Sequence, residues 1–220
     1  MNVANNLLKI KSQLPINVTL VAVSKTKPNN MILEAYQAGQ RIFGENKVQE
    51  MVDKYHSLPK DIQWHLIGHL QTNKVKYIVP FVSLIHAVDS MKLIQEIDKQ
   101  AKKHNRVIDV LIQFHIAEEQ SKFGLDIAEG IDMLDEYLFF DLKHVRIVGV
   151  MGMATFTNDV NQIREEFRTL KQYFDVIKGE HFSDCDDFKH ISMGMSGDYQ
   201  IAIEEGSTMV RIGSSIFGNR

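Results

Sequence analysis

The sequence is poor in cysteine and proline and has no long apolar run: one Cys and four Pro occur among 220 residues. Cys185 has no partner for an internal disulfide and lacks the spacing of a metal-binding pair, which argues against a disulfide-stapled secreted fold. No five like charges are consecutive and the net charge is −3, which argues against nucleic-acid or membrane-surface partners. The chain shows neither a signal-like start nor a stretch that could span a bilayer. We therefore expect a cytoplasmic protein.

What is present is an ordinary globular composition, with 44% hydrophobic and 24% charged residues. Apolar, β-branched stretches alternate with amphipathic ones. The predicted strands are 18–25, 41–44, 62–68, 84–88, 107–116, 144–151, 189–193 and 207–212. The predicted helices are 2–13, 29–39, 45–57, a short one before Pro80, 91–104, 126–138, 159–179 and 198–206.

Alternating strands and helices without a linker predict an α/β fold in one domain, 1–220. We expect a single-domain (β/α)8 TIM barrel, and an open doubly wound sheet is the alternative. Residues 214–220 are too few for a full last helix. We therefore expect the N-terminal helix to replace the missing last helix.

Lys25 ends the first strand, and such strand ends carry the chemistry of parallel barrels. Glycine–serine turns follow the seventh and eighth strands, and they contain Ser196, Gly197, Gly213 and Ser214. Backbone N–H groups in turns of this kind, at this place in a barrel, bind phosphate. In a barrel the first strand closes against the eighth, so Lys25 is expected beside this phosphate site.

A desolvated lysine can form a Schiff base with an aldehyde, and together with a phosphate site it suggests pyridoxal 5′-phosphate (PLP). Arg211 ends the eighth strand, and arginine is one of the partners of the cofactor's pyridine nitrogen. A permanently charged donor there leaves the ring nitrogen unprotonated. Chemistry through a fully developed carbanion would then be disfavoured.

Long motifs in the chain closely resemble those of the pyridoxal phosphate homeostasis protein family. They are VAVSK at 21–25, FGENKVQE at 43–50, WHLIGHLQTNK at 64–74, HAVDS at 86–90, SMGMSGD at 192–198 and VRIGSSIFG at 210–218. The resemblance implies a barrel similar to the N-terminal domain of alanine racemase, with PLP as an internal aldimine on Lys25. It also implies phosphate contacts from Ser196, Gly197, Gly213 and Ser214, Asn46 near the cofactor, and Arg211 at the pyridine nitrogen.

The chain departs from the family pattern at three places. Phe114 and His115 stand where the family usually has Val-Asn, residues 119–124 read EQSKFG where it has Glu-Ser-Lys-x-Gly, and 150–154 read VMGMA. His115 therefore puts in doubt a ligand contact from the fifth strand. Separately, His65 and His69 share a spacing of four, but no glutamate follows His65 and the segment is a predicted strand. We expect hydrogen bonding there and no metal.

Two classes of function follow from this reading. The first is a non-catalytic PLP handler, a monomer that buffers or delivers the cofactor to apo PLP-dependent enzymes and so influences amino-acid and keto-acid balance. The second is a PLP-dependent racemase or lyase. Two-base racemisation needs a second acid/base, and the chain ends at Arg220 without room for the β domain of alanine racemase-like enzymes. A phosphosugar-type barrel enzyme would explain the phosphate site but not the motifs.

Overall fold

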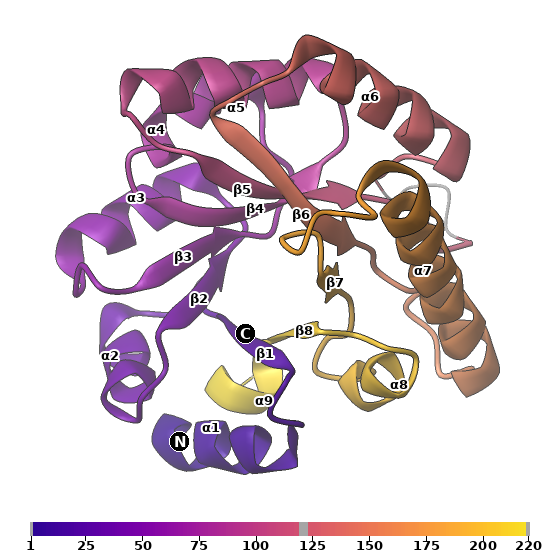
Figure 1. Ribbon diagram of the computed structural model, residues 1–220. Coiled ribbons are helices and arrows are strands. Elements are labelled where there is room, and N and C mark those ends of the chain that lie inside the picture. The colour runs from indigo at the N-terminus through magenta and orange to yellow at the C-terminus, as the bar shows by residue number, and fades with distance from the viewer. Residues whose placement is uncertain (1, 119–122, 219–220) are drawn as a thin grey trace.

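The computed structural model describes residues 2–118 and 123–218, and within them parallel strands close into an eight-stranded barrel with helices around it (Figure 1). The strands are β1 Thr19–Val23, β2 Ile42–Glu45, β3 Gln63–Leu66, β4 Val82–Val88, β5 Ile108–Gln113, β6 Val145–Met151, β7 His190–Ser192 and β8 Met209–Ile212. The helices are α1 Val3–Gln13, α2 Asn29–Gln37, α3 Val48–Ser57, α4 Val75–Ile78, α5 Met91–Lys103, α6 Ile127–Phe140, α7 Val160–His181, α8 Tyr199–Glu204 and α9 Ser214–Phe217, with a 3-10 turn η1 at Thr72–Lys74.

The pairing of β1 with β8 closes the barrel. Leu20 is opposite Val210 and Val21 is opposite Arg211 in a parallel register. The predicted (β/α)8 barrel is confirmed, and the open sheet is wrong because an open sheet would leave these two strands unpaired. The closure also brings the loops after β1 and β8 to the same rim.

Alternate residues of each strand face opposite sides of the barrel wall. On β8, Val210 and Ile212 belong to the large apolar cluster shared with the helices, so Arg211 between them faces the interior. A smaller cluster, which includes Val21 and Leu111, fills the inside of the barrel. Polar side chains therefore lie inside the barrel among apolar ones.

Helix α1 covers the barrel next to β8, as predicted. It buries Val3, Leu7 and Ile10, and at the bottom of Figure 1 it lies beside α9. Asn6 Nδ2 donates to the carbonyl of Ile216 in α9 at 3.1 Å. The structure refines the prediction because residues 214–217 form a one-turn helix, which α1 packs against.

Two local predictions are wrong. Glu45 was placed at the start of a helix, but it is the last residue of β2, paired in register with Leu66, and α3 starts at Val48. The fifth strand ends at Gln113, and Phe114 makes only an isolated bridge to Leu125. The departure at residues 119–122 lies outside the described residues. Within the described part of the chain, no helix is long and apolar enough to cross a membrane.

Candidate functional site

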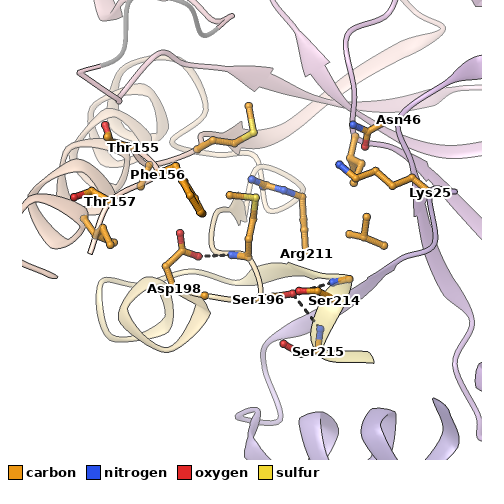
Figure 2. Close-up of a pocket in the computed structure, with 18 of the residues that line it drawn as sticks. Lys25, Asn46, Thr155, Phe156, Thr157, Ser196, Asp198, Arg211, Ser214 and Ser215 are labelled. Carbon is orange, nitrogen blue, oxygen red and sulfur yellow. Dashed lines mark hydrogen bonds between the residues drawn. The ribbon is translucent and has the colours of Figure 1, made fainter. Parts of the chain in front are cut away.

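A cavity of about 640 Å³ opens at the carboxyl ends of the strands (Figure 2). Its wall contains every residue that the sequence singled out for cofactor binding. These are Lys25, Asn46, Ser196, Gly197, Arg211, Gly213 and Ser214. They come from β8 and from the loops after β1, β2, β7 and β8, so the closure of the barrel is what brings them together.

Lys25 does not end the strand, as predicted, but lies in a tight turn after β1, which stops at Val23. The N–H of Lys27 donates to the carbonyl of Ser24 at 3.0 Å, which closes the turn around Lys25 and Thr26. In Figure 2 the lysine side chain extends into the cavity toward Arg211, with Asn46 beside it. The end of β1 is buried, and the turn that follows it directs the amine of Lys25 into the cavity.

Asn46 is placed by close packing against Gly68. A Cβ atom at Gly68 would lie 2.5 Å from the backbone oxygen of Asn46, so only glycine allows this approach. Asn46 follows Glu45 at the end of β2 and lines the cavity. The sequence motif that contains Gly68 therefore has a packing role as well.

The phosphate-like site consists of loop backbone and small side chains. Ser196 Oγ accepts hydrogen bonds from the N–H groups of Gly213 at 3.2 Å and Ser215 at 3.5 Å. In Figure 2 these serines lie together on the side of the cavity nearest α9. Gly194 holds the preceding loop with φ of +94°, where a Cβ would meet Ala202 Cβ at 2.6 Å. Such an array of N–H and hydroxyl donors suits the oxygens of a phosphate.

Arg211 is buried on the floor of the cavity, and uncharged groups hold it. Its Nη1 donates to the carbonyl and the hydroxyl of Ser192, both at 2.7 Å, and its Nη2 donates to the carbonyl of Gly152 at 3.0 Å. Burial lowers the pKa of Arg211 to about 10, with Asp198 opposing the shift. The guanidinium therefore remains charged at neutral pH, and these acceptors do not cancel its charge.

Two buried histidines continue the hydrogen-bond chain behind Arg211. Ser192 Oγ lies 3.0 Å from His86 Nδ1, and His86 Nε2 lies 3.0 Å from His65 Nδ1. Burial lowers the pKa of His65 to about 3 and that of His86 well below 6.5. Both rings are therefore neutral at pH 7, and each has one donor and one acceptor nitrogen for the chain.

The two histidines considered for a metal site do not meet. His65 bonds to His86 inside the barrel, whereas His69 stacks on Phe123 outside it and lies 3.8 Å from Asp89. This bears out the expectation of hydrogen bonding for His65. Across residues 2–118 and 123–218, no group of three or more His, Cys, Asp or Glu could hold a metal ion.

The far wall of the cavity is the loop after β6, which the sequence did not single out for binding. Thr155 donates from its N–H and from its hydroxyl to the buried carboxylate of Glu166 in α7, both at 2.6 Å. Phe156 and Thr157 follow and line the cavity. Thr155 and its anchor are 11 residues apart, in a loop and in the helix that follows it, and no spacing motif marks the pair in the sequence.

A second set of polar residues lies beneath Lys25, and no role was assigned to it from the sequence. It consists of Glu45, Glu50 and Lys54. Their side chains form buried or half-buried ion pairs. The spacing of Glu50 and Lys54, four apart on a helix, was a visible signal for one pair. Glu45 was hidden because it was assigned to a helix.

Taken together, the wall offers an amine, an array of phosphate donors and a buried cation. These groups fit a small phosphorylated aldehyde that carries a ring nitrogen. His115, in contrast, does not line the cavity, and neither does any other described residue of β5 or the segment that follows it. The doubted contact from the fifth strand is therefore not part of this wall.

Comparisons with known proteins agree with this fit. The sequence profile of the family described as alanine racemase, N-terminal domain, matches residues 1–220. A pyridoxal phosphate homeostasis protein from Aquifex aeolicus (strain VF5) is 42% identical over 202 residues, which are 91% of this chain and 86% of that protein.

Solved structures confirm the predicted barrel. PipY from Synechococcus elongatus PCC7942 is 35% identical, covering 98% of this chain and 100% of that one, with a TM-score of 0.91 without PLP and 0.87 with PLP bound. Alanine racemase from Bartonella henselae, with covalently bound pyridoxal phosphate, has a TM-score of 0.75 at 16% identity, covering 99% of this chain and 61% of that one. The second likeness shows the fold alone.

Proposed function

This chain belongs to the family of pyridoxal phosphate homeostasis proteins, and we propose that it holds PLP covalently on Lys25. It is a PLP-binding protein of cofactor homeostasis, and pyridoxal 5′-phosphate is its cofactor. The observation that carries the assignment of residues is the single cavity that gathers Lys25, Arg211 and the Ser196 loop. Each residue has a distinct part in the proposal.

Lys25 supplies the covalent bond. Its Nζ adds to the aldehyde carbon of the cofactor, a C=N bond forms, and the aldehyde oxygen leaves as water with the two amine protons. The turn at the end of β1 presents this side chain to the cavity. Asn46, packed beside it, is proposed to contact the cofactor ring.

The loops after β7 and β8 supply noncovalent affinity. We assign the phosphate to Ser196, Gly197, Gly213 and Ser214, all of which line the cavity. The N–H group of Gly213 already donates to a hydroxyl oxygen there, which supports its use as an anion donor. Binding through these groups does not require the amine of Lys25.

Arg211 sets the electronic state of the bound ring. A guanidinium is only a donor, so a pyridine nitrogen facing it accepts a hydrogen bond and stays unprotonated. When bound, the cofactor can in principle act as an electron sink for amino-acid chemistry, and this partner weakens that capacity. We therefore propose a role in storage and delivery, with no appreciable turnover.

The cavity wall supports the same conclusion. Racemisation through two bases requires a proton donor or acceptor on each face of the substrate carbon. Among the described residues, the lining side chains that titrate are Lys25, Lys27, Asp198 and Arg211, and none is a tyrosine, histidine or cysteine. The two candidates for a second base already hold the wall: Lys27 Nζ donates to the carbonyl of Gly218 at 2.8 Å, and Asp198 Oδ1 accepts from the N–H of Met195 at 2.5 Å. A racemase or lyase would have to break one of these bonds to use either group as a base.

Reduction with borohydride tests the covalent assignment, because it fixes the C=N bond as a stable mass increase. The modification should map to the peptide that contains Lys25 and should disappear in Lys25→Ala. Lys27→Ala is the matched control: Lys27 lines the same cavity, but its amine donates to the carbonyl of Gly218 at 2.8 Å. A modification that persists in Lys25→Ala would overturn the assignment.

A turnover assay separates the handler from the enzyme. PLP-loaded protein incubated with alanine or serine should show no steady-state racemisation or elimination. The cofactor should instead pass slowly to an added apo PLP-dependent enzyme, the partner that we propose in the cytoplasm, while the handler itself remains a monomer. Turnover that is lost in Lys25→Ala would favour the enzyme.

A further inference from the structure

A buried ionic cluster, consisting of Glu45, Glu50 and Lys54, lies directly behind the turn that carries Lys25. The side chain of Glu45 is fully buried and that of Lys54 is 7% exposed. Lys54 Nζ lies 2.9 Å from Glu45 Oε1 and 2.7 Å from Glu50 Oε1. An ammonium group has three protons, and the third is accounted for by a bond to the carbonyl of Ser24 at 2.8 Å.

The cluster holds the residue before Lys25 twice. Lys54 binds the Ser24 carbonyl, and the Ser24 hydroxyl donates to Glu45 Oε1 at 2.5 Å. The same carbonyl accepts the N–H of Lys27 that closes the turn. Glu45 and Lys54 therefore fix the start of the turn through both its backbone and its side chain.

The cluster also holds the residue after Lys25. The N–H of Thr26 donates to Glu50 Oε1 at 2.5 Å. Thr26 has φ of +64°, a left-handed conformation that is unfavourable for a β-branched residue and is usually taken by glycine or asparagine in a turn. Glu50 thus stabilises a strained turn at the one peptide group that follows the lysine.

Fold stability alone does not account for this arrangement. Glu45 Oε2 is buried without a hydrogen-bond partner among the described residues. Burial raises the pKa of Glu45, with Lys54 and the Ser24 hydroxyl opposing the shift. Replacing a buried ion pair by apolar groups of the same shape is often neutral or stabilising, so stability is weak grounds for keeping a pair with an unsatisfied oxygen. What the cluster does fix is the backbone conformation on either side of Lys25.

We propose that Glu45, Glu50 and Lys54 are positioning residues for Lys25, which hold its turn so that the amine meets the cofactor aldehyde. None of them lines the cavity, so they act through Ser24 and Thr26. This inference rests on the proposed covalent role of Lys25. It predicts that the cluster governs the condensation step and not the affinity for phosphate.

Two ligands distinguish these effects. PLP has an aldehyde, whereas pyridoxine 5′-phosphate has an alcohol in its place and can bind only noncovalently. In Glu45→Gln, the rate of C=N formation with PLP, followed by absorbance and borohydride trapping, should fall by about ten- to a hundredfold, because a small misplacement of a reacting group has effects of that size. The affinity for pyridoxine 5′-phosphate should remain within about twofold.

Glu205→Gln is the matched control. Glu205 is also mostly buried and paired, to Arg164 and Arg168, but it lies at the end of α8 away from the Lys25 turn. This variant should condense with PLP at the wild-type rate. An equal slowing in both variants would show a general effect on the fold and would overturn the positioning role.

A rescue experiment tests the part of Glu50. Glu50→Ala removes the oxygen that accepts the Thr26 N–H and should slow condensation, and adding Thr26→Gly should restore part of the rate, since glycine adopts the positive φ without strain. Failure of glycine to restore any rate would contradict the proposal that Glu50 acts on this turn. The double variant Glu45→Gln/Lys54→Met keeps the experiment possible if a single variant does not fold, because it removes both charges of the fully buried pair and leaves only Glu50, whose side chain is 25% exposed, without its counter-ion.

The outcomes separate the two levels of the proposal. Wild-type protein that forms no C=N bond with PLP would overturn the function proposed for Lys25 and, with it, the positioning role. Wild-type protein that condenses, together with a Glu45→Gln variant that condenses equally fast, would overturn the positioning role alone.

Discussion

Lys25 and Arg211 face the same cavity, and the groups behind these two cations differ in kind. Behind Lys25 lies an ionic cluster that holds the backbone on both sides of the residue. Behind Arg211 lies a chain of neutral groups, from Ser192 to the histidines, that holds the guanidinium itself. Lys25, which must react, is thus fixed through the backbone on either side of it. Arg211, which must only donate a hydrogen bond, is fixed by bonds to its guanidinium group.

The difference follows from what each cation does in the proposal. Carboxylates bonded directly to Arg211 would neutralise the charge that faces the ring nitrogen. The acceptors that the structure gives it are carbonyl and hydroxyl oxygens instead. Around Lys25, charged groups can be used because they bind the neighbouring peptide groups of Ser24 and Thr26.

Breaking the ionic cluster behind Lys25 should have the largest effect on stability. Lys54→Met would leave the fully buried Glu45 without its counter-ion, and removing one partner of a buried pair typically costs about 3–5 kcal/mol. The free energy of unfolding, measured with urea, should fall by an amount in this range. Lys92→Met, at an exposed lysine of α5, is the control and should change it by less than about 0.5 kcal/mol. Similar values for the two variants would contradict the comparison.

Acidification should protonate the histidines behind Arg211 and so break the neutral hydrogen-bond chain. His65, with a pKa lowered to about 3, binds a proton less tightly in the folded than in the unfolded chain, where its pKa is 6.5. Its contribution is fully present above pH 6.5 and is lost as the pH falls toward the folded pKa, so at pH 5 the loss is about 2 kcal/mol.

Urea unfolding of the wild type and of His65→Gln at pH 7 and pH 5 measures this loss as the difference between the two proteins, because burial also lowers the pKa of His86, which therefore acts with the same sign in both. His65→Gln should flatten the dependence, and His104→Gln, at an exposed histidine, should not. Glu45 has the opposite sign: its pKa is raised above 4.5, so its contribution is present at low pH and is lost as the pH rises. An unchanged slope in His65→Gln would show that the neutral chain does not set the acid sensitivity.

A pair of serines gives the finest test. Ser24, which bonds to the ionic cluster, and Ser192, which belongs to the neutral chain, are both fully buried. Ser24→Ala removes a donor from the charged Glu45 and should cost about 1.5–3 kcal/mol, as for hydrogen bonds to charged groups. Ser192→Ala removes a hydroxyl that accepts from the charged Arg211, which keeps its two carbonyl acceptors, and should cost a similar amount, about 1.5–3 kcal/mol. Only Ser24→Ala should also slow the condensation of PLP. Slower condensation in Ser192→Ala than in Ser24→Ala would contradict the assigned roles.

Much of this molecule was predictable from its sequence, for identifiable reasons. The strand that leads to the Lys25 turn is an apolar, β-branched run, and the turns at Ser196 and Gly213 have local glycine–serine chemistry. Barrel closure then follows from the count and alternation of strands, and it brings these residues to one cavity. Periodicity and turn chemistry depend only on neighbouring residues, so they can be read without knowing the fold.

The supporting groups were not predictable in the same way. Glu45 was assigned to a helix because it precedes one, whereas pairing with β3 keeps it in a strand. Its role depends on Lys54 approaching Ser24 across the fold, and no local pattern encodes that approach. The histidine chain likewise joins β3, β4 and β7 inside the barrel. Such contacts exist only after closure.

The most direct test of the account is a comparison of two affinities in Lys25→Ala and in wild-type protein. Wild type should bind PLP more tightly than pyridoxine 5′-phosphate, because only PLP can bond to the amine. In Lys25→Ala the two ligands should bind with equal, weaker affinity through the phosphate donors and Arg211. A variant that still prefers PLP, or that binds neither ligand, would contradict the separation of covalent capture from noncovalent binding.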